Sequence, residues 1–158
     1  MPEQAPPDQD SIVSEIEIAA PPDRVFRALT DPKQQMVWWG AEPSCELRSF
    51  EMDARPGGRW GFQASDRTGH AVNGVTEFEA HGEVLEVTPP IRLKYTWIAN
   101  WHHDKSRVTE VLWELFPTPA GTRVKVTHSG LAQEAVARKD YAGGWPGVLQ
   151  LLRNFFTQ

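Results

Sequence analysis

The feature that most limits the fold of this chain is a series of segments in which apolar and polar residues alternate one by one. The clearest segment, 91–98, places apolar residues at every second position: Ile91, Leu93, Tyr95 and Trp97. Such alternation is typical of a β-strand with one buried and one exposed face. Similar segments follow one another with short turn-like connections, which favours an antiparallel meander over a parallel sheet.

We expect six or seven strands in all. The segments that carry the pattern are 12–18, 45–52, 60–64, 72–87, 91–98, 109–115 and 123–128. The longest of them, 72–87, changes the parity of its apolar residues after Gly82, since Leu85 and Val87 fall on the opposite face from Phe78 and Val84. A β-bulge at Gly82 would explain that change.

Helical spacing appears at two places. After Pro22, which is well placed in a first helical turn, Val25, Phe26 and Leu29 predict a short helix that ends before Asp31-Pro32. A second short piece leads to Trp39 and closes at Gly40.

The end of the chain predicts a longer amphipathic helix. Trp145, Leu149, Leu152 and Phe156 share one helix face, and the preceding stretch 133–139 can form a turn or two. We expect Gly143-Gly144 and Pro146 to break or kink the helix between the two parts. A face this apolar must be covered, and only the sheet is large enough to cover it.

Composition and charge narrow the class of protein. With 158 residues the chain can bury one core, so we expect a polar, disordered tail over 1–10 and one domain over 11–158. A net charge of −5 without a basic cluster argues against nucleic acid or a membrane surface as partner. No apolar run could span a bilayer, and no secretion signal is visible, so we expect a cytoplasmic protein. One cysteine, Cys45, excludes an intramolecular disulfide.

Nine short motifs, in order along the chain, resemble those of a known superfamily. They are 18–26 (IAAPPDRVF), Trp38-Trp39-Gly40, Pro56-Gly57-Gly58 with Trp60, 82–90 with Arg92-Leu93, 95–97, 108–110, Gly121-Thr122, 127–131, and Gly144-Trp145 with Leu149 and Leu152. Together they resemble the START-like (SRPBCC) helix-grip superfamily of START domains, birch-pollen-allergen-like proteins and polyketide cyclases. Within it the chain is similar to the branch homologous to the activator of the 90-kDa heat-shock protein ATPase. Pro146 and the aromatic loop Trp101-His102-His103-Asp104 depart from that pattern.

The resemblance implies an α+β helix-grip fold, in which a curved antiparallel sheet wraps around the long C-terminal helix. It also implies a cavity between helix and sheet. We expect its walls, and hence the ligand-binding residues, to be Trp38, Trp60, Phe62, Phe78, Trp97, Trp113, His128, Trp145 and Leu149.

Candidate catalytic and metal residues are few. His128 shares the inward parity of Val124 and Val126, and we favour a core histidine with a satisfied ring over a general acid or base. His102, His103 and Asp104 could supply metal ligands, but we favour a solvated loop. Glutamates at 77, 79, 83, 110 and 114 fit the solvent face of the sheet. We therefore predict no catalytic residue, no metal site and no cofactor.

Three functions follow, in order of preference. The first is binding of a small hydrophobic or aromatic molecule, without catalysis. The second, implied by the resemblance, is a stress-response role as a co-chaperone that activates a chaperone ATPase. The third is a polyketide cyclase- or hydrolase-like enzyme that uses His128 or a nearby carboxylate as acid or base. A monomer and a homodimer are both compatible with the sequence.

Overall fold

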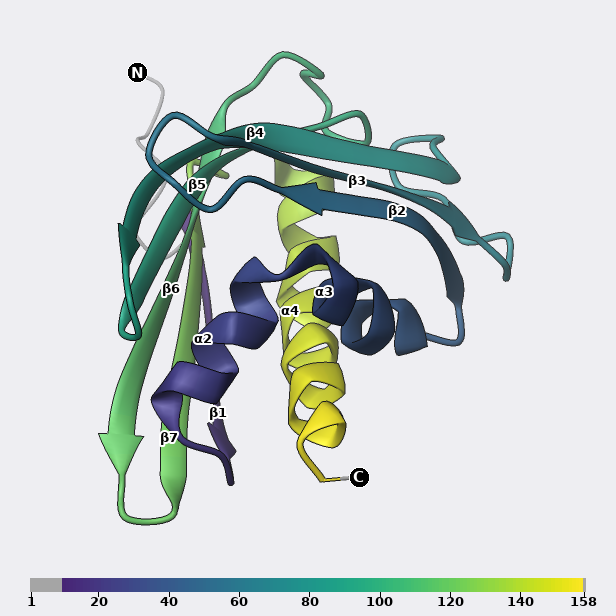
Figure 1. Ribbon diagram of the computed structural model, residues 1–158. Coiled ribbons are helices and arrows are strands. Elements are labelled where there is room, and N and C mark those ends of the chain that lie inside the picture. The colour runs from purple at the N-terminus through teal and green to yellow at the C-terminus, as the bar shows by residue number, and fades with distance from the viewer. Residues whose placement is uncertain (1–9, 158) are drawn as a thin grey trace.

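Seven strands pair into one antiparallel sheet in the order β1-β7-β6-β5-β4-β3-β2. The computed structural model describes residues 10–157, and the sheet curls so that its concave side holds the helices (Figure 1). The strands are β1 (Ile12–Ile18), β2 (Cys45–Met52), β3 (Arg59–Asp66), β4 (Glu77–Thr88), β5 (Arg92–Ala99), β6 (Thr109–Thr118) and β7 (Gly121–Ser129). The predicted α+β helix-grip fold is confirmed.

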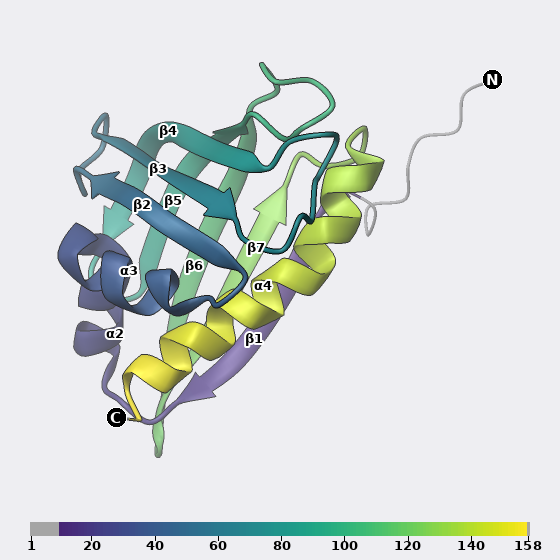
Figure 2. The same ribbon diagram turned by 90° about the vertical axis from the view of Figure 1, so that its right-hand side faces the viewer.

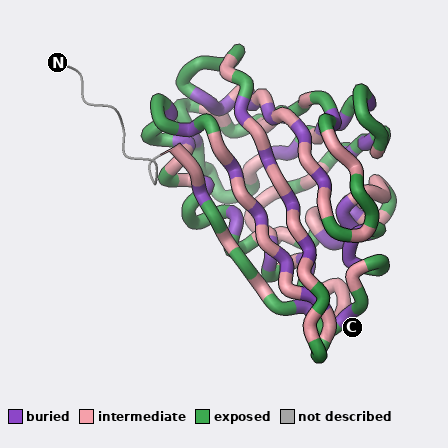
Figure 3. The backbone as a smooth tube through the Cα atoms, turned by 90° about the vertical axis from the view of Figure 1, so that its left-hand side faces the viewer, coloured by how far each residue is buried: buried purple, intermediate pink, exposed green. Residues whose placement is uncertain are grey.

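Burial follows the predicted alternation closely in the central strands. From β5 to β7 every second residue is buried and its neighbours are partly exposed (Figure 3). The outward residues pair across strands: Arg92 binds both Glu86 and Glu114, at 3.0 and 3.3 Å. The glutamate row therefore lies on the outer face of the sheet, as predicted.

Helices α2 (Pro22–Thr30) and α3 (Pro32–Trp38) follow β1 directly. Asp31 separates them because a residue before proline is pushed into an extended conformation, here φ −96° and ψ 112°. Its carboxylate then accepts a hydrogen bond from the backbone N–H of Lys33 at 3.0 Å, which caps α3. The 3-10 turn η1 (Trp39–Ala41) leads into β2.

The C-terminal helix α4 (Ala135–Phe155) is continuous through Gly143-Gly144 and Pro146, where we expected a break or a kink, so these residues do not break it (Figure 2). A proline inside a helix costs about 3 kcal/mol. Here Pro146 is exposed, while one buried face runs through the same stretch without interruption. Its members are Ala137, Tyr141, Trp145, Leu149 and Leu152. Packing of this face against the sheet, with β1 alongside, holds the helix together.

Two predictions on β4 also need correction. The strand begins at Glu77 rather than at residue 72, since Val72 and Val75 pair with each other around a tight turn. The bulge falls between Val84 and Glu86, at Leu85, and not at Gly82. Gly82 has a different role: the indole of Trp60 crosses over it to bond the carbonyl of Thr96 at 2.7 Å, and a β-carbon there would overlap that carbonyl.

The predicted tail, 1–10, lies outside the described residues except for Asp10. The backbone carbonyl of Asp10 accepts a hydrogen bond from Leu131 at 2.8 Å, and its carboxylate accepts one from Gly130 at 3.1 Å. These contacts fix the start of β1 beside the end of β7.

Candidate ligand cavity between the sheet and the C-terminal helix

A cavity of about 400 Å³ lies between one end of the sheet and helix α4. Its wall is mostly apolar and aromatic, and comes from η1, β2, β3, β4, β5, the loop after β5, and α4. The apolar residues that line it are Trp39, Leu47, Phe62, Ala64, Val72, Phe78, Trp97, Trp101, Tyr141, Trp145, Val148 and Leu151. Ligand cavities in proteins typically have volumes of about 300–1,000 Å³ and walls of this kind.

Four of the nine predicted wall residues line this cavity: Phe62, Phe78, Trp97 and Trp145. The other five, Trp38, Trp60, Trp113, His128 and Leu149, are at most 1% exposed and belong to the packed core behind it. Trp38 illustrates why. Its indole N–H donates to the carbonyl of Ala28 at 2.8 Å, so Trp38 turns into the core and the next residue, Trp39, meets the cavity.

Three aromatic residues of the wall were not predicted: Trp39, Trp101 and Tyr141. Tyr141 lies four residues before Trp145 on the same face of α4, so helical spacing could have identified it. Trp101 could not be found in this way, because it lies in the loop after β5 and follows no periodic pattern.

The back of the cavity is held by hydrogen bonds between aromatic side chains. The indole N–H of Trp97 donates to the hydroxyl of Tyr141 at 2.9 Å, and His102 Nε2 lies 2.8 Å from the same oxygen. The rings of Trp97 and Trp145 meet edge to face at 5.6 Å. These contacts fix the positions of large rings that would otherwise adapt freely, so this part of the wall is preorganised.

Trp101 leaves one polar atom on the wall without a partner. Its indole N–H faces the Tyr141 hydroxyl, but it makes no hydrogen bond of normal geometry within residues 10–157. The Tyr141 oxygen already bonds Trp97 and His102. The Nε1 atom is itself buried, so this N–H is closed off from the open space of the cavity.

The rim of the cavity is polar and acidic. It carries the carboxylates of Glu42, Asp66 and Asp140, together with Ser44, Cys45, Thr68 and His70. His70 Nε2 lies 3.3 Å from Asp140 Oδ1 across the rim. Partial burial, and to a smaller extent the neighbouring carboxylates Asp66, Glu42 and Asp140, raise the pKa of the Cys45 thiol. Cys45 is therefore a poor nucleophile at neutral pH.

His128 is a satisfied core histidine, as favoured from the sequence. Its Nδ1 accepts the indole N–H of Trp145 at 3.2 Å, and its Nε2 lies 2.8 Å from Thr109 Oγ1. Thr109 donates its own proton to the carbonyl of Trp97 at 2.8 Å. The ring therefore carries its proton on Nε2 and is neutral. Burial, and to a smaller extent His102, lower its pKa to about 3.

The loop from Trp101 to Arg107 is only in part the solvated loop that we predicted. His103 and Asp104 are exposed, but Trp101 and His102 are 5% and 1% exposed. Trp101 is buried because it packs edge to face against Phe78 and lies beside Phe62, at centroid distances of 5.4 and 6.1 Å.

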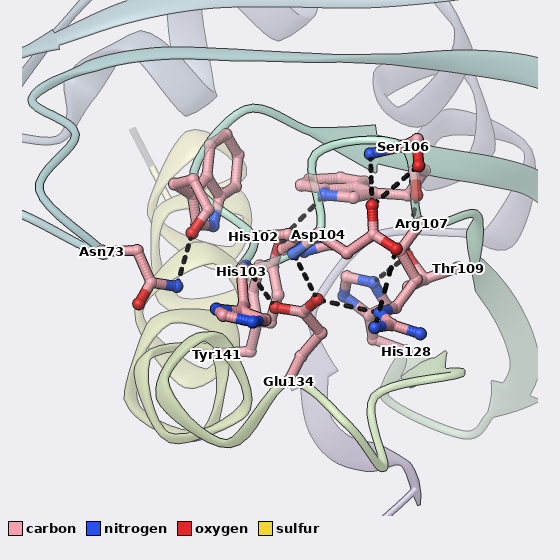
Figure 4. Close-up of polar contacts among 12 residues, drawn as sticks. Asn73, His102, His103, Asp104, Ser106, Arg107, Thr109, His128, Glu134 and Tyr141 are labelled. Atoms are coloured by element: carbon pink, nitrogen blue, oxygen red, sulfur yellow. Dashed lines mark hydrogen bonds and ion pairs between the residues drawn. The ribbon is translucent and has the colours of Figure 1, made fainter.

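Glu134, just before α4, anchors this loop (Figure 4). Its carboxylate accepts the backbone N–H groups of His103 and Asp104 at 2.6 and 3.0 Å, and Arg107 Nε at 2.8 Å. Burial alone would raise the pKa of Glu134, but these hydrogen bonds outweigh it and lower the pKa below its usual value. The charged carboxylate thus ties one wall of the cavity to the start of the helix that forms the other.

In the part of the chain that the structure describes, no cluster of three or more His, Cys, Asp or Glu side chains is arranged to hold a metal ion. Within residues 10–157, no helix has the length and apolar character needed to cross a bilayer.

Comparison with solved structures shows the same fold in bacterial proteins. Protein CV1439 from Chromobacterium violaceum aligns with a TM-score of 0.77 and 23% identity, over 94% of this chain and 99% of its own. Protein NE0264 from Nitrosomonas europaea gives 0.75 and 25%, over 96% of both chains. CalU16 from Micromonospora echinospora gives 0.64 and 23%, over 92% of this chain and 75% of its own.

No curated protein matches the sequence. A family model does: the one described as activator of Hsp90 ATPase homolog 1-like protein covers residues 19–157, from the end of β1 past the end of α4. That range includes every wall of the cavity. The chain therefore belongs to the family of activator of Hsp90 ATPase homolog 1-like proteins, on the helix-grip fold.

Proposed function

We propose that the protein binds a small hydrophobic or aromatic molecule in the cavity between the sheet and α4, and that it does so without catalysis. The observation that carries the proposal is the cavity of about 400 Å³ with a wall of aromatic rings. A cavity of this size with an apolar wall offers an apolar ligand packing contacts with several rings at once.

The preorganised wall supports the same proposal. Trp97, Tyr141 and His102 hold one another by hydrogen bonds, so their rings are in place before any ligand arrives. A site that needs little ordering on binding retains more of the energy of contact.

Intrinsic fluorescence is the direct test, because Trp39, Trp97, Trp101 and Trp145 line the cavity and the chain has seven tryptophans in total. The purified protein would be titrated with a panel of lipids and aromatic metabolites. We expect saturable changes in tryptophan emission with at least one class of compound. No response from any member of the panel would count against the proposal.

A matched pair of variants locates the binding. Val148→Trp adds an indole inside the cavity, whereas Val136→Trp adds the same indole to an exposed position of the same helix, at a residue that is 54% exposed. Val148→Trp should abolish binding and Val136→Trp should leave it unchanged. If both variants bind as the unmodified protein does, the ligand lies elsewhere.

The family name supports a second candidate, activation of a chaperone ATPase. It is tested by adding the protein to an Hsp90-type chaperone from the same organism and measuring ATP hydrolysis. A stimulated rate would support it, and an unchanged rate with no binding at micromolar concentrations would end it.

The cyclase- or hydrolase-like alternative has less support. CalU16 and DynU16, a protein of the dynemicin biosynthetic locus, share the fold at 23% and 19% identity. His128, however, is fully engaged by Thr109 and Trp145 and lies behind the cavity wall. The His70–Asp140 pair is on the cavity but at its rim, where the His70 side chain is 64% exposed. An inward acid–base pair of the kind that such chemistry uses is not formed by either histidine.

A further inference from the structure

We propose that the ligand of this cavity is a cation, an aromatic or aliphatic ammonium compound whose apolar body lies among the rings and whose charged end lies at the acidic rim. This inference rests on the proposed function and deepens it by assigning a charge to the ligand. Three features of the cavity support it: the negative charge of the rim, the lack of lysine or arginine partners for the rim carboxylates, and the aromatic wall.

The rim has charges of one sign. Glu42 follows η1, Asp66 ends β3 and Asp140 lies on α4, so three separate elements each bring a carboxylate to the same opening. Neither lysine nor arginine is among the residues that line the cavity. His70 is the one basic side chain there, and it lies beside Asp140.

The carboxylates at the rim are held in place but not neutralised. Glu42 accepts hydrogen bonds from the backbone and hydroxyl of Ser44 at 3.0 and 2.7 Å, and Asp66 accepts the N–H of Thr68 at 3.0 Å. Within residues 10–157 neither Glu42 nor Asp66 forms an ion pair with a lysine or arginine. On the outer face of the sheet, by contrast, acidic residues are commonly paired, as Glu86 and Glu114 are with Arg92.

Cys45 provides a second view of the potential at the rim. Its thiol lies on the edge strand β2. Burial is the largest cause of its raised pKa, and the carboxylates of Asp66, Glu42 and Asp140 raise the pKa further. All three charges thus reach one point of the opening. A cation there gains from each of them, and an anion such as a fatty acid carboxylate is repelled by each.

The wall beyond the rim suits an organic cation as well. Trp39 and Trp97 line the space, and aromatic rings can attract ammonium groups through the ring quadrupole. A hydrated metal ion would not use such a wall, whereas an amine with an apolar body uses both parts of the site.

The experiment compares three ligands with one aromatic body: 2-naphthylmethylammonium, 2-naphthylmethanol and 2-naphthoate, each titrated by calorimetry. We expect the ammonium compound to bind about tenfold more tightly than the alcohol, and the carboxylate more weakly than both, because each partly exposed charge contributes modestly. Added salt should weaken binding of the ammonium compound and leave binding of the alcohol unchanged.

Two double variants supply the control. Glu42→Gln with Asp66→Asn keeps the oxygen that Ser44 and Thr68 need and removes two charges. Glu17→Gln with Glu83→Gln makes the same change of net charge at exposed positions that do not line the cavity. The first pair should reduce the preference for the ammonium compound several-fold, and the second should retain it.

A ligand-independent measurement uses Cys45, the one cysteine of the chain. Its rates of reaction with a trimethylammonium-bearing and a sulfonate-bearing methanethiosulfonate, each divided by the rate for free cysteine, report the local potential. We expect the cationic reagent to react about tenfold faster, and Glu42→Gln/Asp66→Asn to lower that ratio.

The outcomes separate the two proposals. If the alcohol and the ammonium compound bind with equal affinity and the two reagents react at equal rates, the proposal of a cationic ligand is overturned. The proposal that a ligand binds in the cavity is then still supported. If none of the three compounds binds and the fluorescence panel also gives no response, the cavity has no ligand and both proposals are overturned.

Discussion

The concave side of the sheet has two halves that are built alike and filled differently. Under β6, β7 and the first half of β5 the inward residues are completely covered: Val111, Trp113, Val126 and His128 are each at most 1% exposed. Under the parts of β2, β3 and β4 that meet the cavity, the corresponding residues Leu47, Phe62 and Phe78 are only half-buried and line it. We call these the closed half and the open half.

Polar atoms differ between the halves in the same way. In the closed half Trp113 donates to the hydroxyl of Tyr95 at 2.9 Å and Trp145 donates to His128. In the open half the N–H of Trp101 has no partner of normal geometry among residues 10–157. A region that completes both its packing and its hydrogen bonds stabilises the fold, and the region that completes neither is where a ligand can contribute.

Small residues explain where the gap lies. The residues that line the open half include Ala64 and Gly144, next to the much larger Phe62 and Trp145. Gly144 presents no side chain from α4, whereas Leu149 and Leu152, further along the same helix, fill the core. Alternation of apolar residues is the same in both halves, so side-chain volume makes the difference.

The largest test of this contrast is a pair of truncations, Trp113→Ala in the closed half and Phe62→Ala in the open half. Trp113 is 1% exposed and leaves a sealed cavity, so the free energy of unfolding should fall by about 3–5 kcal/mol. Phe62 already borders an open space, so its loss should cost only about 1–2 kcal/mol. Urea unfolding measures both, and equal losses would contradict a difference in packing between the halves.

The next test concerns the loop that carries Trp101. Glu134→Gln removes the charge that binds Arg107 and two backbone N–H groups, and should lower the free energy of unfolding by about 2–4 kcal/mol. Its control is Glu15→Gln, which removes an exposed carboxylate from Arg123 at 3.6 Å and should cost about 0–1 kcal/mol. Hydrogen exchange should increase in the loop 101–107 for the first variant alone.

A third test concerns the close packing of Gly82 against Thr96 and Trp60, at the border between the halves. Gly82→Ala should destabilise by about 1–3 kcal/mol, because its β-carbon overlaps the Thr96 carbonyl that Trp60 bonds. Gly143→Ala is the matched change on α4, where no atom lies within 4 Å of the added carbon. It should instead stabilise by about 0.5–1 kcal/mol, since alanine favours a helix. Thermal unfolding of both variants would show shifts of opposite sign.

The fold could be predicted because apolar residues recur in the sequence with the periods of strands and helices. Alternation gave strands such as β5 and β7 with nearly correct ends, and the turn residues Pro56-Gly57-Gly58 separated β2 from β3. The continuity of α4 could not be predicted, because a local signal at Pro146 opposed a packing energy that depends on the whole sheet. The bulge was misplaced by three residues, because the change of parity shows that the register shifts but does not show at which residue.

The sequence predicted that aromatic residues would line a cavity, but not which of them would do so. Parity placed Trp60, Trp97 and Trp113 on one side of the sheet, but it could not say that Trp97 borders a space while Trp60 and Trp113 are sealed. That depends on the volumes of residues opposite them. The buried role of His102 also has no local signal, because its partner Tyr141 is 39 residues away.

The last test concerns acid stability, and it belongs to the closed half. Native His128 is neutral with a pKa of about 3, whereas an unfolded histidine has a pKa of about 6.5. Below about pH 6.5 the unfolded chain therefore binds a proton that the native protein does not, and stability falls as the pH is lowered towards 3. Between about pH 6.5 and 5 this should amount to about 1–2 kcal/mol.

His128→Gln isolates that contribution, because glutamine stays neutral and retains a donor near Thr109 and an acceptor near Trp145. Urea unfolding at several pH values in this window should give a clearly flatter profile for the variant than for the unmodified protein. Burial also lowers the pKa of His102, at the back of the cavity, so a smaller slope of the same sign should persist in the variant. Parallel profiles would mean that His128 is protonated in the native state, and that the hydrogen bond from Trp145 to its Nδ1 is not formed in solution.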